Sequence, residues 1–451
     1  MPISLSYYNY KFCMYVLLIS IFVLGYLGIA LEHNIKIDKA AAAILTGVIC
    51  WTVLIIGQDT LLVETTPVAG AEETGSFLEE TLLVHIGEIA EILFFLLAAM
   101  TIVELIDVHK GFEVVTDKIT TANRVKLLWI ICSITFFFSA ALDNLTTAIV
   151  MAALLKKLLK KKEDKWFFGG MVVLAANAGG AWSPIGDVTT IMLWIGGQVT
   201  AGHIITTVFL PSLACLLVPL IVLTIKMGGR TERPDSIVEE NPQHPAVTTM
   251  EQKLVFWLGI AGLLFVPVFK NATHLPPFMG MLLSLGILWV TTELLHRSKE
   301  YSRKYQLSVS GVIKKVDTPS ILFFLGILLA VASLQTAGVL QDLAQVLDDT
   351  FHDIYLVNIF IGLLSAVVDN VPLVAGAMGM YSLDTYPTDS TFWELLAYCA
   401  GTGGSVLIIG SAAGVAIMGL LKIEFMWYVR HISWIAILGY FAGVAVLYLL
   451  N

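Results

Sequence analysis

The chain has 451 residues, of which 57% are hydrophobic and only 14% charged, and its mean hydropathy is +0.83. Runs of about 20 apolar residues, each long enough to cross a bilayer, recur from end to end. This composition excludes a soluble enzyme and predicts an all-α polytopic membrane protein. The five cysteines lie in apolar segments without metal-type spacing, so no cofactor is expected.

Ten membrane spans are predicted in chain order. They cover residues 12–31, 40–57, 82–107, 167–197, 203–227, 253–270, 276–296, 319–337, 393–421 and 429–450. Two further segments, around Asp143 and Asp369, do not fit this scheme as simple crossings. Because a single basic residue, Lys11, precedes the first apolar run, a first membrane helix is favoured over a cleaved signal peptide.

The lysine and arginine content of the loops orients the chain. Residues 156–165 carry six lysines and residues 297–315 carry six basic residues, whereas residues 58–80 are acidic with no basic residue. Placing the basic loops in the cytoplasm leaves only Lys11 and Lys270 outside. Both termini are then outside, and we expect a plasma membrane, as in a bacterial inner membrane.

This orientation requires the two remaining segments to be opposed re-entrant hairpins. Residues 127–160 would enter from the cytoplasm and residues 354–382 from outside. Each arm is expected to have about 11 to 16 residues, roughly 17 to 24 Å of helix, too short for a comfortable crossing. Alternatively, each segment is one slightly polar crossing helix, which would strand a large basic loop outside.

The two halves of the chain share three strings in the same order. ILFFLLAAMTIVEL at 92 matches ILFFLGILLAVASL at 321, SAALDNL at 139 matches SAVVDNV at 365, and ANAGGAWSPIG at 176 matches AGTGGSVLIIG at 400. Each half has five spans plus a hairpin, and because five is odd the second copy is inverted. The predicted domains are a first repeat, 1–227, a polar cytoplasmic linker, 228–252, and an inverted second repeat, 253–451.

Glycine clusters predict that two of the helices are broken at mid-membrane. NAGGAWSPIGD, residues 177–187, holds three glycines and Pro184, and GTGGSVLIIGS, residues 401–411, holds four glycines. Unwound backbone at this depth is tolerated only where it is buried in protein or faces water. Inverted repeats with broken helices are typical of secondary transporters. Alternatively, these small residues permit close helix packing.

Each hairpin carries hard oxygen ligands at its tip, which suit a small hard cation. The residues are Ser139, Asp143 and Asn144 in the first half and Ser365, Asp369 and Asn370 in the second. A carboxylate can also exchange its cation for a proton, because burial favours the protonated form and a bound cation favours the ionised form. Alternating cations and protons would explain why buried aspartates are kept. Structural pairing of each aspartate is the alternative.

The strings HIGEIAEILFF at 85, DNLTTA at 143 and ANAGGAWSPIGDVTT at 176 resemble the NhaD-type sodium/proton antiporters of the ion transporter superfamily. The resemblance covers nearly the whole chain from about residue 80 to 425. It implies exchange of sodium or lithium for protons by alternating access, an elevator motion of the hairpin-bearing domain, and a homodimer. The second break has no counterpart of Pro184 or Asp187.

The same resemblance implies which residues bind the transported ion. One sodium or lithium site would be made by Ser139, Asp143, Asn144 and Thr147 with Asn177 and Gly179 of the first break. Its counterpart would be made by Ser365, Asp369 and Asn370 with Thr402 and Ser405 of the second break. The partners of the protein are then the lipid bilayer and small cations, and no nucleic acid is indicated.

Other polar residues in the apolar segments are candidates for a role in transport. Asp187 is interpreted as a cation ligand, a proton relay or a cap on the helix that follows it. His85, Glu88 and Glu91 recur every three residues and lie along one face at the outer end of a helix. Histidine makes this face a candidate pH sensor, and simple solvation at the membrane interface is the alternative.

Antiport is the predicted function, and three other classes were weighed. A carrier of the same fold could move an organic anion or oxyanion, such as a dicarboxylate, citrate or arsenite, but the hairpin tips lack arginines for it. An intramembrane aspartyl protease would pair two aspartates in a Gly-x-Gly-Asp string, which Pro184 breaks. A channel has less use for a titratable group in each half.

Overall fold

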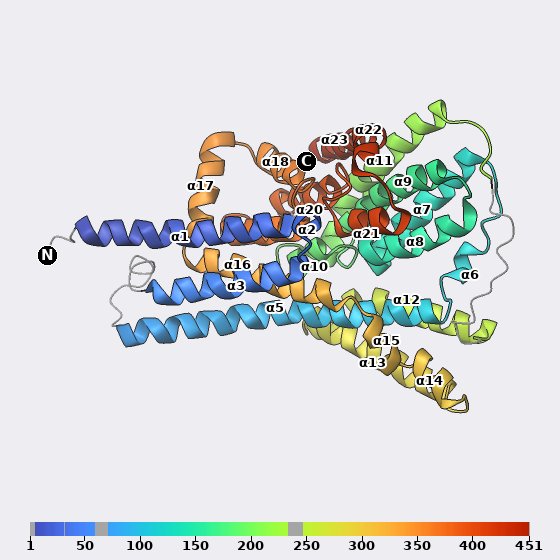
Figure 1. Ribbon diagram of the computed structural model, residues 1–451, viewed down its shortest axis with the longest axis horizontal. Coiled ribbons are helices and arrows are strands. Elements are labelled where there is room, and N and C mark those ends of the chain that lie inside the picture. The colour runs from blue at the N-terminus through green and yellow to red at the C-terminus, as the bar shows by residue number, and fades with distance from the viewer. Residues whose placement is uncertain (1–4, 31, 59–70, 233–246, 451) are drawn as a thin grey trace. The chain divides into compact units, whose positions relative to one another are not determined.

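The computed structural model describes residues 5–30, 32–58, 71–232 and 247–450 (Figure 1). In this part of the chain every regular element is a helix, which confirms the all-α class. The acidic loop predicted within 58–80 and the linker predicted at 228–252 lie partly outside the described residues, as do both chain ends.

The helices follow one another along the chain with short connections. They are α1 (Leu5–Ala30), α2 (Glu32–Ile35), α3 (Lys39–Ile56), α5 (Ala71–Val108), α6 (Glu113–Thr116), α7 (Arg124–Leu142), α8 (Asn144–Leu158), α9 (Lys162–Ala181), α10 (Val188–Ile195), α11 (Ala201–Lys226), α12 (Thr249–Thr273), α13 (Pro277–Leu295), α14 (Tyr301–Leu307), α15 (Val309–Val312), α16 (Thr318–Thr336), α17 (Val339–Phe351), α18 (Ile354–Leu364), α19 (Asn370–Met380), α20 (Thr391–Gly403), α21 (Ala412–Leu421), α22 (Phe425–His431) and α23 (Ser433–Leu450), with a 3-10 turn at Ile313–Lys315.

Among the described residues, eight helices are long and apolar enough to cross a membrane, or up to nine if α21 and α22 form one bent span. Ten spans were predicted, and the main difference lies in the two spans with glycine clusters. The span predicted at 167–197 is divided between α9 and α10, and the one predicted at 393–421 is divided between α20 and α21. The interruptions, at residues 182–187 and 404–411, lie inside the glycine-rich strings.

The first predicted hairpin differs from expectation in the length of one arm. The helix α7 has 19 residues and passes as a membrane span, whereas its partner α8 has 15 residues. The arm is longer than predicted because the Asn123 side chain accepts a hydrogen bond from the Lys126 amide and so caps the helix ahead of residue 127. In the second hairpin, α18 and α19 have 11 residues each, within the expected range.

The chain divides into two compact units, and each draws on both halves of the sequence. The first unit comprises Met1–Leu93, Asp317–Val357 and Val371–Tyr386. Within it α3 packs along α16 and α1 packs on α3. A Cβ atom on Gly47 would lie only 2.5 Å from the Gly326 carbonyl oxygen, so glycine is what lets α3 and α16 approach.

The second unit comprises Phe94–Val316, Asn358–Asn370 and Pro387–Asn451. Its central helix is α9, which is buried along most of its length and contacts α7, α8, α11, α20 and α21. Small residues on α9, such as Gly169 and Gly170, allow these neighbours to come close. The second unit holds both hairpin tips and both helix breaks.

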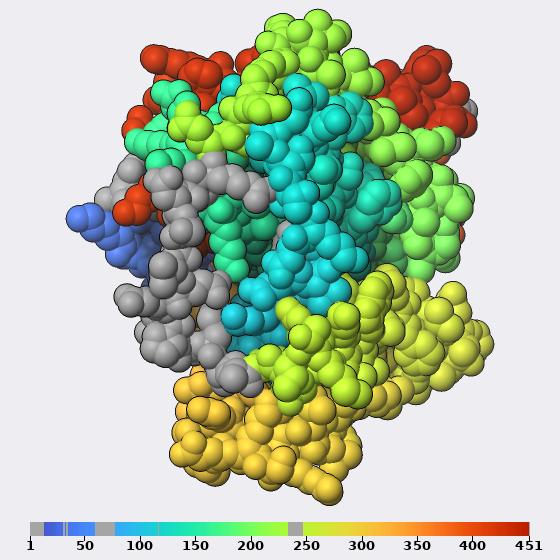
Figure 2. All heavy atoms as spheres, turned by 90° about the vertical axis from the view of Figure 1, so that its right-hand side faces the viewer, coloured from blue at the N-terminus to red at the C-terminus, as the bar shows by residue number. Residues whose placement is uncertain are grey.

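The start of the linker is bound to both ends of the first hairpin. The Arg124 amide donates to the Gly229 carbonyl (3.2 Å), and the Lys160 amide donates to the Glu232 carbonyl (2.9 Å). Figure 2 shows this side of the molecule, where the cyan segment leading into α7 lies near yellow-green residues that flank the linker. The linker is therefore anchored by main-chain hydrogen bonds where it leaves α11.

A buried histidine pair joins the end of α5 to the end of α13. His109 Nδ1 lies 2.7 Å from the Leu105 carbonyl, so this nitrogen carries a proton, and His109 Nε2 lies 2.8 Å from His296 Nε2. His296 must then donate from Nε2, which leaves its Nδ1 without a proton and 3.7 Å from a Glu251 carboxylate oxygen. Burial, assisted by Lys299, lowers the pKa of His296 from 6.5 to about 4, so the pair is neutral near pH 7.

This neutral pair predicts an acid sensitivity of folding. Because the folded-state pKa of His296 lies below its unfolded value, the pair stabilises the fold above pH 6.5, and this contribution is lost as the pH falls towards 4. The variant His296→Gln, which still donates to His109, is expected to lose less melting temperature than the wild type between pH 6.5 and 4. Thermal unfolding in detergent tests this, and equal losses would contradict it.

Candidate cation and proton site

Glycines in both breaks bring a hairpin arm against the helix that ends there. A Cβ atom on Gly179 would overlap the backbone of Phe136 in α7, and one on Gly403 would overlap the backbone of Gly362 in α18. The two halves thus use a glycine at the same place in the shared string for the same purpose. Gly179, predicted as part of the site, contributes through this close approach.

These contacts predict that the glycines are needed for stability. The substitutions Gly179→Ala and Gly403→Ala are each expected to destabilise the fold by about 1–3 kcal/mol, because the added methyl group meets backbone that cannot move aside. Gly202→Ala in α11 is the matched control, since nothing lies within 4 Å of its Cβ position. Thermal unfolding of the three variants tests this, and a loss in the control of the same size would contradict it.

The predicted serines hold each hairpin to its neighbouring broken helix. Ser139 Oγ donates to the Ala176 carbonyl (2.5 Å), and Ser365 Oγ donates to the Ala400 carbonyl (2.8 Å). Both side chains are fully buried. The two serines therefore make equivalent contacts in the two halves, with helix carbonyls rather than with the aspartates that follow them.

Asp143 forms the junction between α7 and α8. Its backbone has φ +86° and ψ 159°, a conformation that is strained for a residue other than glycine. One carboxylate oxygen accepts from the Thr146 amide (2.8 Å) and the other from the Thr146 hydroxyl (2.7 Å). Asp143 thus caps α8, and its position at a helix N-terminus favours the ionised carboxylate. Each oxygen retains a further lone pair for a cation.

Asp187 lies between the two hairpin tips. It caps α10 through the Thr189 amide (3.2 Å), as the cap interpretation predicted, and it is 1% exposed. Its Oδ2 atom accepts hydrogen bonds from the side-chain amides of both Asn144 (2.9 Å) and Asn370 (3.2 Å). One buried carboxylate therefore connects both predicted asparagines, which lie far apart in the sequence.

Asn177 extends this network to the second break. Its Oδ1 atom accepts from Asn144 Nδ2 (3.2 Å), and its own amide donates to the hydroxyls of Ser405 (3.0 Å) and Ser411 (2.9 Å). Asn177 is fully buried in the last turn of α9. The network, defined here as Asn144, Asn177, Asp187, Asn370, Ser405 and Ser411, thus includes residues from both halves of the chain.

Ser411 is a network residue that sequence reasoning missed. It caps α21 with φ −147° and ψ 153°, nearly the same backbone conformation as Asp187 at the start of α10, with φ −148° and ψ 150°. The shared strings place Ser411 opposite Asp187 when the two breaks are superposed residue by residue. This signal was present in the sequence, where the second break appeared to lack a counterpart of Asp187.

Two buried hydroxyls beside the network have no hydrogen-bond partner among the described residues. They belong to Thr147, one turn after Asn144 in α8, and to Thr189, in the first turn of α10. A buried polar group without a partner costs about 1–3 kcal/mol, so such groups are rare unless something completes them. These two oxygens fit a site whose ligand is a cation. Thr189 was not among the predicted ligands.

Some predicted residues lie apart from the network. The Thr402 hydroxyl donates to the Tyr398 carbonyl within its own helix (2.6 Å). His85 belongs to the other compact unit, where its ring nitrogens lie 3.4 Å from a Glu88 oxygen and 3.4 Å from the Thr336 hydroxyl. The interaction with Glu88 has the spacing that was predicted for this helix face.

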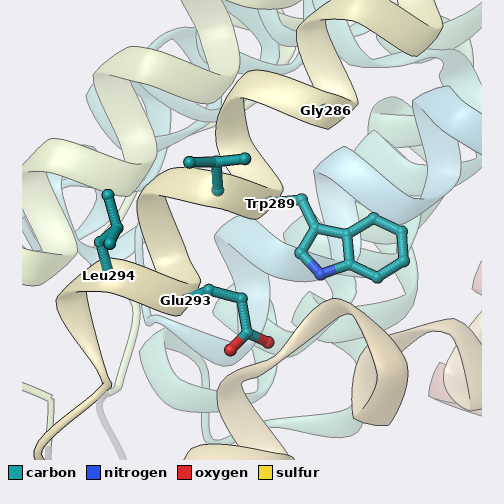
Figure 3. A pocket seen from close by; sticks show the side chains of 5 residues that line it. Gly286, Trp289, Glu293 and Leu294 are labelled. Carbon is teal, nitrogen blue, oxygen red and sulfur yellow. The ribbon is translucent and has the colours of Figure 1, made fainter.

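A surface pocket of about 450 Å³ is separate from the network. All of its lining residues, Gly286, Trp289, Val290, Glu293 and Leu294, come from α13 (Figure 3). Its carboxylate, on Glu293, is 2.7 Å from the Lys304 ammonium. The pocket therefore contributes no residue to the candidate site.

Comparison with known proteins identifies the family. Residues 15–393 match the family model CitMHS, described as a citrate transporter. The chain is 46% identical over 427 residues to sodium/proton antiporter 1 of Arabidopsis thaliana, covering 94% of this chain and 70% of the relative. It is 43% identical to antiporter 2 of the same plant, covering 94% and 97%. It is 30% identical to the Na(+)/H(+) antiporter NhaD of Vibrio cholerae, covering 96% and 91%. The chain is thus a multi-pass membrane transporter, not an enzyme, and it belongs to the NhaD-type sodium/proton antiporter family within the wider citrate transporter family.

Proposed function

We propose that this protein exchanges sodium or lithium for protons across a membrane by alternating access, with carboxylates that bind the cation and the proton competitively. The observation that carries the proposal is the buried Asp187 carboxylate, which accepts amide hydrogen bonds from both hairpin tips. The names of the relatives, which are sodium/proton antiporters in plants and bacteria, support the same activity.

The network explains how a cation could replace hydrogen bonds at this carboxylate. The Asn144 amide nitrogen contacts two oxygens, Asn177 Oδ1 and Asp187 Oδ2. If the Asn144 amide turns by half a rotation, its own oxygen faces the same point, and three oxygens then surround a position for a small cation. The partnerless hydroxyls of Thr147 and Thr189 supply further oxygens nearby. Without a cation, a proton on the carboxylate would neutralise it instead.

Equivalent contacts in the two halves support an inverted repeat, with the first repeat at 1–227 and the second at 253–451. They are the serine–carbonyl contacts of Ser139 and Ser365 and the glycine contacts of Gly179 and Gly403. In this proposal Asp143 and Asp369 lie at the tips of opposed hairpins and bind cations with the neighbouring asparagines. The basic loops are cytoplasmic, both termini are outside, and a homodimer moves by an elevator mechanism.

A transport assay tests the function. We expect sodium or lithium, added to proteoliposomes that hold an imposed pH gradient, to collapse the gradient in a saturable way that depends on pH. Potassium and dicarboxylate serve as comparison solutes, and protein-free liposomes give the background. A gradient that no cation disturbs would contradict the proposal.

The second candidate is a cation-coupled carrier of an organic anion or oxyanion, which the description of the family model favours. The network offers a carboxylate, three side-chain amides and two hydroxyls, and no arginine or lysine belongs to it. A carboxylate substrate would face Asp187 without a cationic partner, so we favour antiport. Uptake of labelled citrate driven by a sodium gradient, with no effect of sodium on the pH gradient, would support the carrier instead.

A further inference from the structure

A buried carboxylate that the network does not use lies near the start of α20. The Glu394 side chain is 3% exposed, and its Oε1 atom lies 2.5 Å from His203 Nε2 in the first turn of α11. The His203 side chain is 40% exposed. A histidine in contact with solvent is thus paired directly with a carboxylate that is shielded from it.

The groups around Glu394 make His203 its cationic partner. The Thr207 hydroxyl, one turn further along α11, also bonds to the carboxylate, and the Asp389 carboxylate faces it from the preceding loop. Asp389 is itself held by the Thr200 amide (2.6 Å) and hydroxyl (2.8 Å). Of the other described helices that pack on α20, α10 and α23 carry no charged residue, and the charges of α9 stand in its first turn.

A line of buried polar groups leads from this pair towards the second break. Glu394, Tyr398 and Thr402 follow one another at intervals of four along α20, so they lie along one face of the helix over roughly 12 Å. Opposite them on α11, the Cys215 thiol bonds to the Tyr398 hydroxyl. The Ser212 hydroxyl is buried without a partner among the described residues. The last turn of α20 leads directly into the break that holds Ser405.

We propose that His203 and Glu394 form the proton entrance of the antiporter, exchanging protons between water and the buried site. The inference rests on the proposed function and adds the route of the proton to it. Under the proposed orientation the His203 end of α11 faces outside, because Lys226 at its other end belongs to the cytoplasmic linker region. Protons enter from this side when sodium is expelled from the cell.

The transfer requires no partner other than water. A proton from water binds Nδ1 of neutral His203 and gives the imidazolium. The Nε2 proton then passes to Oε1 of Glu394, which becomes a neutral carboxylic acid and leaves the other neutral tautomer of the histidine. Exchange of the ring protons with water restores the first tautomer. Glu394 releases its proton along the polar face of α20, and the carboxylate is ready for the next one.

Two transport modes of the same protein separate a proton entrance from a structural role. Sodium/proton exchange needs the entrance, whereas exchange of labelled for unlabelled sodium across the membrane needs no proton. We expect Glu394→Gln, which can still accept from His203, to lower sodium/proton exchange by about 100-fold and to leave sodium/sodium exchange within about twofold of the wild type. Glu424→Gln, a carboxamide replacement at an exposed carboxylate paired with Lys162, is the matched control and should leave both modes unchanged.

A chemical rescue tests the histidine separately. His203→Ala is expected to lower sodium/proton exchange, and imidazole added on the side that His203 faces should restore part of it, because free imidazole can protonate Glu394 directly. Loss of both transport modes in Glu394→Gln, or full sodium/proton exchange in that variant, would overturn the inference. Absence of sodium/proton exchange in the wild type would overturn the proposed function, and the proton entrance with it.

Discussion

Asp187→Asn is expected to lower sodium/proton exchange at least about 100-fold while the protein remains folded. Asparagine has the same shape as aspartate and is an equally good cap for α10, so the helix start should be kept. It carries no charge and can bind neither a proton nor a cation in competition. Its amide nitrogen would also face the donor groups of Asn144 or Asn370, which now share one carboxylate oxygen.

The measurements are proton flux in proteoliposomes and binding of labelled sodium to the purified protein. Melting temperature in detergent reports whether the variant is folded. Glu293→Gln is the matched control, because its carboxylate lies on α13 outside the network and should be dispensable for exchange. If the Asp187→Asn variant exchanged sodium for protons at the wild-type rate, Asp187 would be a structural cap alone.

Asp143→Asn is expected to abolish exchange as well, and the comparison with Asp143→Ala separates charge from structure. Asparagine tolerates positive φ and can cap α8 through its side-chain oxygen, so the junction between α7 and α8 should survive. Alanine offers no cap, and we expect Asp143→Ala to destabilise the fold by about 1–2 kcal/mol. Thermal unfolding and proton flux measured on both variants check these outcomes.

Each result for Asp143 has a distinct meaning. Loss of exchange with an unchanged melting temperature in Asp143→Asn would assign the carboxylate charge to transport. Normal antiport in that variant would remove Asp143 from the mechanism and leave Asp187 as the carboxylate on which the proposal depends. Thr146, which donates to both Asp143 oxygens, would then be part of a purely structural cap.

The features that the sequence predicted well are those with local causes. The breaks after α9 and α20 were predicted because glycine clusters interrupt apolar runs, and helices do end at these clusters. The hairpin tips were identified because Asp143-Asn144 and Asp369-Asn370 are polar pairs in apolar surroundings. The length of α7 was underestimated although its cause is also local, since Asn123 is a helix-capping residue directly before it.

The sequence by itself determined the all-α membrane class, the family, the positions of the helix breaks and most residues of the candidate site. Composition and short strings suffice for these, because hydrophobicity and backbone propensity act over a few residues. Only the tertiary structure decided that Asn144 and Asn370 donate to one Asp187 oxygen, that Ser411 joins Asn177, and that His203 lies on Glu394. Such contacts join residues up to about 200 positions apart, and they depend on how helices pack, which no local pattern in the chain encodes.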